Sequence, residues 1–175
     1  MARLPAEDAV LQNLPATEQP VKVVTDPGTG GIYWLDFVGN IYHMATNGER
    51  RDVLRTTGPG RMALFIADFC LDASDRCLYF TDLRDAKTGK SAIKRIDLQG
   101  GKITTLATFA QEVPYRVGMR ASDRKLYYFA RGLHSPHQLY HLKVLGQDAP
   151  LVTSAGKLSD LERWMNDYLE TLAAQ

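Results

Sequence analysis

Short runs of β-branched and aromatic residues alternate with polar turns along most of the chain, and no helical period competes with them over residues 20 to 153. The stretch IADFCLDASDRCLYFTD, residues 66 to 82, aligns with PYRVGMRASDRKLYYFA, residues 114 to 130, and both contain Ala-Ser-Asp-Arg. An earlier copy, PVKVVTDPGTGGIYWLD, occupies residues 20 to 36. The copies start at residues 20, 66 and 114, which gives a period of 46 to 48 residues. We therefore interpret the chain as three internal repeats.

Each repeat continues in the same way, with an aliphatic-basic strand, a turn and a last short strand. The third strands are predicted at NIYHM (40–44), AIKRI (92–96) and QLYHL (138–142), and the fourth at DVL (52–54), KITTLAT (102–108) and PLVT (150–153). Four short strands in a repeat of this length are typical of β-propeller blades. The predicted fold is all-β and β-propeller-like, with three four-stranded antiparallel blades over units of about 20–60, 61–110 and 111–154, plus a C-terminal α-helix.

The aromatic runs give the chain a family resemblance. IYWLD, LYFTD and LYYFA, each followed by a strand such as IKRIDLQGGKITTLA, resemble the YWTD repeats of lipoprotein-receptor propellers and the related NHL and gluconolactonase-like six-bladed propellers. The resemblance covers roughly residues 20 to 153 and implies the fold, since these repeats serve many unrelated functions. It also implies that Asp36 and Asp82 are structural and bond backbone at the blade junction. Ala130 takes this place in the third repeat, so we expect that blade to join its neighbour differently.

Three repeats are fewer than a closed propeller has, since closure typically takes at least four blades. Open sheet edges are templates for pairing with other chains. We therefore expect the protein to pair with something. A symmetric homodimer would have six blades, and cyclic dimers are the commonest soluble oligomers. Pairing with a different protein that supplies blades, or an open array whose edges the terminal segments cover, are the alternatives.

The two ends of the chain differ from the repeats. Residues 1–19 are predicted as an N-terminal segment and linker. In residues 155–175, Ser159 and Glu162 form a capping-box pattern that predicts an amphipathic helix. Its apolar face contains Leu161, Trp164, Met165, Tyr168, Leu169 and Leu172 at helical spacing. This face either caps the end of the repeat array or docks another protein, with Trp164, Met165, Tyr168 and Leu172 as the candidate interaction residues.

Composition and charge narrow the function classes. The formal net charge of +1 gives no electrostatic basis for binding nucleic acid or an anionic membrane. Pro5, Glu7 and Asp8 lie where a signal peptide needs an apolar core, and no apolar run has the length of a membrane span. Two cysteines do not make a secreted disulfide scaffold. We therefore expect a cytoplasmic protein with protein partners.

A row of charged residues at the start of the innermost strands is the candidate ligand site. Lys22, Asp68 and Arg116 hold the same place in the three repeats. They form either a structural ion-pair cluster around the central channel or a contact surface for a polar ligand or an acidic partner. In the gluconolactonase-like relatives the preceding position supplies a metal ligand, but here Val21, Ala67 and Tyr115 occupy it, and none suits a hard cation. We expect no metal and no other cofactor.

The cysteines and histidines suggest no stronger site. Cys70 and Cys77 flank a turn and are interpreted as reduced thiols that fill space. His43, Arg95 and His141 are interpreted as equivalent basic residues of the third strands, solvated or hydrogen-bonded. His134 and His137 form an H-x-x-H loop with no carboxylate or cysteine near it in sequence, which argues against a metal site.

The preferred functional hypothesis is a non-enzymatic binding or assembly module, because no nucleophile elbow, phosphate loop or catalytic carboxylate pair is present in the sequence. The alternative is a gluconolactonase-like lactone hydrolase whose channel site, around Asp68 and Arg116, forms on dimerisation. A third hypothesis is a paralogue that modulates a full-length propeller by blade exchange.

Overall fold

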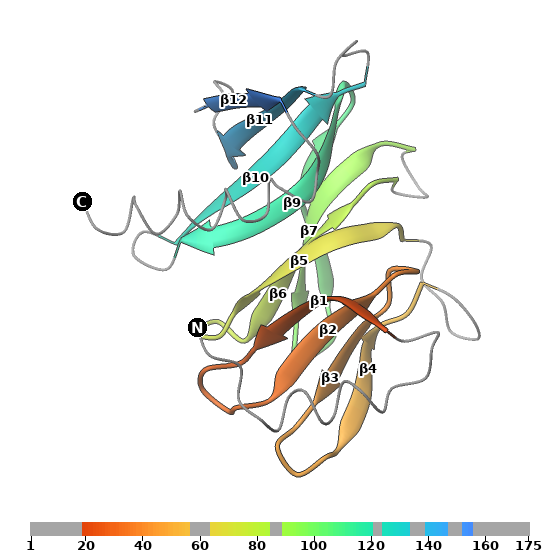
Figure 1. Cartoon of the computed structure of the whole chain (residues 1–175), viewed down its shortest axis with the longest axis vertical. Helices are drawn as coiled ribbons and strands as arrows, with labels where there is room; N and C mark the ends of the chain where they lie inside the picture. Colours follow the sequence, from red (N-terminus) through yellow and green to blue (C-terminus); the bar gives the residue numbers. More distant parts are fainter. Residues whose placement is uncertain are drawn as a thin grey trace. The chain divides into compact units, whose positions relative to one another are not determined.

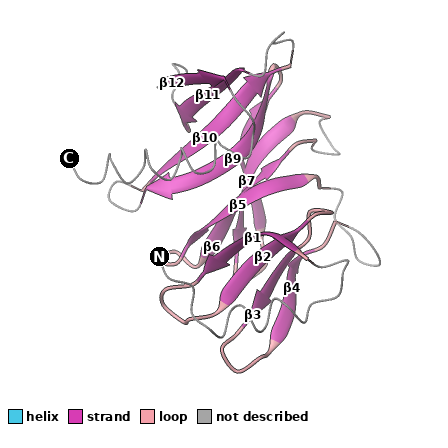
Figure 2. Ribbon diagram, viewed as in Figure 1, coloured by secondary structure: helices cyan, strands magenta, loops and turns pink. Residues whose placement is uncertain are grey.

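The computed structural model describes residues 19–56, 64–84, 89–120, 124–133, 139–146 and 152–155. These residues form twelve strands in three four-stranded antiparallel sheets, with no helix among them (Figures 1 and 2). The first sheet belongs to one compact unit, residues 1–63, and the other two to a second unit, residues 64–175. The predicted blades are confirmed. The predicted C-terminal helix lies outside the described residues.

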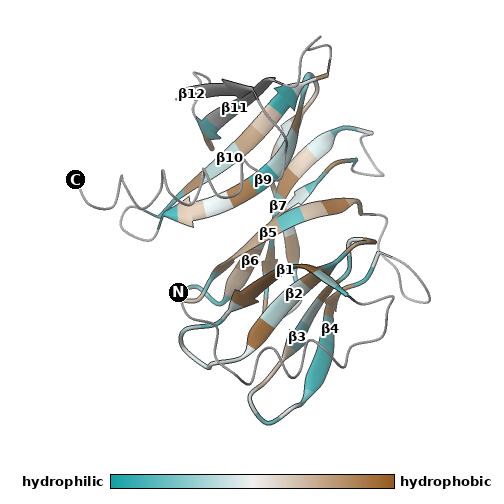
Figure 3. Ribbon diagram, viewed as in Figure 1, coloured by the Kyte–Doolittle hydropathy of each residue, from teal (hydrophilic) through white to brown (hydrophobic). Residues whose placement is uncertain are grey.

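The first sheet has the strand order β1-β2-β3-β4, so that each strand pairs with the next along the chain. Its strands are β1 (Pro20–Thr25), β2 (Ile32–Asp36), β3 (Ile41–Met44) and β4 (Arg50–Leu54). Gly31, before β2, lies so close to the third strand that an added Cβ would come within 2.8 Å of His43 Nε2 and 3.0 Å of the Met44 carbonyl oxygen. The outermost strand, β4, begins with exposed polar residues and is mostly teal in Figure 3.

The second and third sheets repeat this order. The second consists of β5 (Ile66–Asp72), β6 (Cys77–Asp82), β7 (Ser91–Asp97) and β8 (Ile103–Phe109), and the third of β9 (Glu112–Arg120), β10 (Lys125–Gly132), β11 (Leu139–Val144) and β12 (Val152–Ala155). Arg76 and Arg124 end the two Ala-Ser-Asp-Arg turns, and both have a left-handed backbone, with φ of 49° and 58°. The last residue of the repeated sequence therefore has the same backbone conformation in both copies.

Alternating side chains give each sheet its apolar faces. In the first sheet, Ile32, Trp34 and Tyr42 form a buried cluster in which the rings of Trp34 and Tyr42 stack at 5.1 Å. Between the second and third sheets, Ile93 packs with Tyr128 and Ala130. The second and third blades are thus joined by an apolar core. The described residues contain no helix of the length and hydropathy that a membrane span requires.

Candidate functional site

The innermost strand of every sheet has a β-bulge at the same place. The pairing of β1 with β2 shifts between Pro20 and Lys22, that of β5 with β6 shifts between Ile66 and Asp68, and that of β9 with β10 passes over Tyr115. The bulged residues are therefore Val21, Ala67 and Tyr115, the three positions where the resembling enzymes place a metal ligand. Bulges redirect the side chains that follow them.

The charged row follows these bulges. Lys22 pairs with Leu35, Asp68 with Thr81 and Arg116 with Phe129, which are equivalent positions of the second strands. The expected equivalence of the three residues is confirmed by this register. Lys22 belongs to the first compact unit, and Asp68 and Arg116 belong to the second.

Asp68 and Arg116 connect the second sheet to the third. The Asp68 side chain is buried, and its Oδ2 accepts a hydrogen bond of 2.8 Å from the Val117 amide of β9. In the opposite direction, Arg116 Nη1 donates to the Ala67 carbonyl oxygen at 3.3 Å. Asp68 of β5 thus bonds the backbone of β9, and Arg116 of β9 bonds the backbone of β5. Both residues therefore have a structural role at the junction.

The opposite end of the same junction also uses charge. Arg124 Nη2 lies 2.6 Å from Asp72 Oδ2 and 2.6 Å from Asp75 Oδ2, so the third sheet's turn holds the second sheet's turn. The other oxygen of Asp72 accepts from the amides of Ser74 and Asp75. The turn of the second sheet therefore both closes its own hairpin and offers carboxylates to the third sheet.

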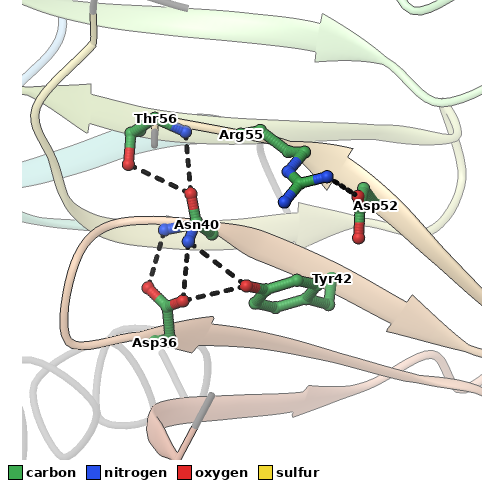
Figure 4. A network of polar contacts seen from close by, with 6 residues as sticks. All are labelled: Asp36, Asn40, Tyr42, Asp52, Arg55 and Thr56. Atoms are coloured by element: carbon green, nitrogen blue, oxygen red, sulfur yellow. Dashed lines mark hydrogen bonds and ion pairs between the residues drawn. The ribbon is translucent and has the colours of Figure 1, made fainter. Parts of the chain in front are cut away.

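The motif aspartate of the first sheet organises a buried polar network (Figure 4). Asp36 Oδ1 accepts from the amides of Val38 and Asn40, and Oδ2 accepts from Asn40 Nδ2 at 2.8 Å and the Tyr42 hydroxyl at 3.0 Å. Asn40 Oδ1 then accepts from the amide and hydroxyl of Thr56, just beyond β4. Asp36 therefore ties the β2–β3 turn to the connection that leaves the sheet.

The motif aspartate of the second sheet forms a buried ion pair instead. Asp82 Oδ2 accepts from Lys94 Nζ at 2.7 Å, and the two side chains are only 0% and 6% exposed. Asp82 Oδ1 accepts from the Phe65 amide at 2.9 Å, immediately before β5. Asp82 thus bonds the backbone of a connection between sheets directly, as the family resemblance implies, whereas Asp36 reaches the connection at Thr56 only through Asn40.

The third sheet lacks this aspartate and rearranges its lysine. Lys143 pairs with Tyr128 as Lys94 pairs with Phe80, so the two lysines are equivalent. Because Ala130 offers no carboxylate, Lys143 Nζ instead bonds to Glu112 Oε1 at the start of β9. The Glu112 carbonyl oxygen accepts from the Ser91 hydroxyl of the second sheet at 2.6 Å. This arrangement agrees with the expectation that the third blade joins its neighbour differently from the other two.

The third sheet has a second apolar face, on the side away from the second sheet. Tyr128 and Ala130 pack against Ile93, and side chains alternate along a strand, so Tyr127 and Phe129 point to the opposite side. Val144 pairs with Tyr127 and shares that side. We call Tyr127, Phe129 and Val144 the outer face.

Cationic groups border the outer face. The Arg120 guanidinium lies 5.4 Å from the centre of the Tyr127 ring, and Lys125 pairs with Arg120. On the other side, Arg131 lies 5.5 Å from the Tyr115 ring centre and donates to its hydroxyl at 3.2 Å. Sequence reasoning did not identify this border. Its sequence indication was the grouping of Arg120, Arg124 and Lys125 around the hairpin.

Neither cysteine is part of a disulfide, and both lie on one face of the second sheet. Cys70 pairs with Tyr79 and Cys77 with Asp72, so they are not opposite each other. Burial, and after it a hydrogen bond with the Cys77 side chain, raise the pKa of Tyr79 above its ordinary value. A hydrogen bond with Cys77 also raises the pKa of Arg95. The Cys77 thiol therefore belongs to a polar cluster with Tyr79 and Arg95.

The expected equivalence of the three basic residues is only partly right. His43 pairs with Tyr33 and Arg95 with Tyr79, which are equivalent positions. His141 pairs with Ala130, so it lies elsewhere in its strand. The equivalent place belongs to Val144, which pairs with Tyr127, and a displacement of three residues moves a side chain to the opposite face.

Few other features of the described residues suggest a ligand. His43, Ala45, Glu49 and Arg51 line an open cleft of about 220 Å³ in the first sheet. The described residues hold no group of three or more His, Cys, Asp or Glu that suits a metal ion. His134, His137, Trp164, Met165, Tyr168 and Leu172 lie outside the described residues.

Comparison with known proteins supports the fold. A chain of the nidogen/laminin complex has a TM-score of 0.54 and 20% identity, over 81% of this chain and 48% of its own length. The extracellular domain of a one-component system from B. thetaiotaomicron has a TM-score of 0.48 and 12% identity, over 78% of this chain and 16% of its own. TolB from Acinetobacter baumannii has a TM-score of 0.43 and 15% identity, over 77% of this chain and 32% of its own length.

The first of these likenesses shows a β-propeller-type fold, and its low identity shows the fold alone. The present chain spans about half (48%) of the matched nidogen/laminin chain. No family model matches the sequence, and no curated protein is significantly similar to it.

Proposed function

We propose that the protein is a non-enzymatic binding or assembly module, whose propeller-like array is completed by blades from outside its three sheets. The preferred source is a second copy of the chain, and a different protein is the alternative. The specific resemblance to YWTD repeats belongs to this proposal, since such repeats build six-bladed propellers and two copies of three blades would supply six.

The junction between the second and third sheets carries this proposal. It is built from repeated positions: Asp68 bonds the next sheet's backbone, and the Asp72 turn accepts the next sheet's Arg124. The residues at these positions differ between the repeats: Arg116 and Arg120 of the third sheet stand where Asp68 and Asp72 stand in the second, so a further blade would meet arginines there in place of carboxylates. Three blades of this kind are below the minimum of about four for closure.

The engagement of Asp68 favours a binding module over a lactone hydrolase. A catalytic carboxylate has to reach its substrate with an available oxygen. Asp68 is only 1% exposed, and its Oδ2 already accepts a hydrogen bond from the Val117 amide. Loss of this carboxylate is therefore expected to loosen the junction of the two sheets.

The experiment that tests the proposal is solution mass by light scattering over a dilution series. A mass of two chains that persists on dilution supports closure by a second copy. A monodisperse monomer at every concentration overturns that form of the proposal. Calcium-dependent lactone hydrolysis by the purified chain, abolished in Asp68→Asn with the fold intact, would overturn the non-enzymatic function itself.

A further inference from the structure

The outer face of the third sheet is apolar and yet screened from water. Phe129 is 0% exposed, Tyr127 3% and Val144 5%. The second sheet does not cover these residues, because it packs against Tyr128 and Ala130 on the opposite side. Something else must therefore cover the outer face.

The position of the last described strand indicates which segment of the chain covers the outer face. The last described strand, β12, forms the free edge of the third sheet and ends at Ala155. Only residues 156–158 separate it from the capping box at Ser159. A connection this short spans at most about 14 Å. One face of the sheet is occupied by the second sheet, so the outer face is the apolar surface within reach.

The sequence of this segment complements the outer face. Residues 159–173 present six apolar residues at helical spacing and carry four carboxylates, Asp160, Glu162, Asp167 and Glu170, against one arginine. The border of the outer face is cationic, with Arg120, Lys125 and Arg131. An isolated helix of about 15 residues is marginal in water, so it needs such a surface to form.

We propose that residues 159–173 cover the outer face within the same chain, as an amphipathic helix whose Trp164 and Tyr168 side lies on Tyr127 and Phe129 and whose acidic side meets the cationic border. The outer face is where the next blade of a propeller would pack. The segment therefore closes this end of the array against a further blade unless it is displaced. At this face the inference competes with the proposed function, because a blade from a second copy can pack on the third sheet only where the segment is displaced.

The test is hydroxyl-radical labelling of the full-length chain, read residue by residue by mass spectrometry. We expect Tyr127 to be protected in the wild type and its labelling to rise several-fold in a Trp164→Ser/Tyr168→Ser variant. The matched control is Asn166→Ser/Thr171→Ser, which changes polar positions of the same segment and should leave Tyr127 protected. Labelling of Tyr128, which packs against Ile93 on the other side of the third sheet, reports whether that sheet is folded in each variant.

Two results would overturn the proposal. One is equal protection of Tyr127 in the wild type and in the folded Trp164→Ser/Tyr168→Ser variant. The other is protection that disappears on dilution of the wild type, which would identify a second copy as the cover. A Glu162→Lys/Asp167→Lys variant adds a test of the charge match. Its Tyr127 labelling should exceed that of the wild type at low salt, and unchanged labelling would contradict the cationic border's role.

Discussion

Lys143 bonds to Glu112 in the third sheet, although its counterpart Lys94 bonds to Asp82 in the second. The two lysines occupy equivalent positions, but the second strand of the third sheet has Ala130 where the repeat places aspartate. The lysine is therefore kept while its partner moves from the second strand to the start of the first. The two ion pairs differ in burial, and this difference makes them separable by mutation.

Lys94→Met should destabilise the protein much more than Lys143→Met. Asp82 is fully buried, and removing one partner of a buried pair costs about 3 kcal/mol because the remaining charge is uncompensated. Lys143 and Glu112 are both partly exposed, so water can replace the lost partner and the cost should be about 1 kcal/mol. Urea unfolding measures both free energies. Equal losses would show that burial does not distinguish the two pairs.

The repeat made most of the fold predictable, because turns and aromatic strands recur at one period. The alignment also placed Lys22, Asp68 and Arg116 correctly, since the bulge before each of them recurs as well. By contrast, His141 was misplaced by three residues, because Val144 holds the equivalent place and the strand pattern alone does not reveal this register.

The partners of the site residues were not predictable from the sequence. Asp68 accepts from an amide that follows it by 49 residues, and the backbone of β9 offers no side-chain pattern that would indicate this donor. The Lys143 and Glu112 pair depends on how the bulge at Tyr115 shifts the side chains of β9. Such contacts depend on register, which is settled only when the strands are paired.

Asp36→Ala should cost about 3 kcal/mol of unfolding free energy. The substitution leaves Asn40 Nδ2 and the Tyr42 hydroxyl, both buried, without their shared acceptor. Asp52→Ala is the matched control in the same sheet, since Asp52 forms only an exposed ion pair with Arg55 at 3.1 Å (Figure 4). That variant should lose less than about 1 kcal/mol. A similar loss in both variants would refute a structural role for the motif aspartate.

Ala130→Asp restores the missing motif residue and should nevertheless destabilise the third sheet. The new carboxylate would lie among Ile93 and Tyr128, while Lys143 is already bound to Glu112. A buried carboxylate without a partner is costly. Adding Glu112→Gln frees the lysine, so the double variant should be more stable than the sum of the single changes by about 1 to 2 kcal/mol. Strict additivity in thermal or urea unfolding would contradict the equivalence of Lys143 and Lys94.

Tyr79→Phe should make the protein less sensitive to alkaline pH. Burial chiefly, and a hydrogen bond with Cys77 secondly, raise the pKa of Tyr79 in the folded state above the value of about 10 in the unfolded chain. Unfolding therefore releases a proton above pH 10, so the stability from this group is complete below pH 10 and is lost as pH rises toward the folded pKa. The free energy of unfolding should then fall more steeply between pH 9 and pH 11 in the wild type than in Tyr79→Phe, with pH 8 as the common baseline. Parallel curves for the two proteins would mean that Tyr79 ionises as readily in the fold as in the unfolded chain.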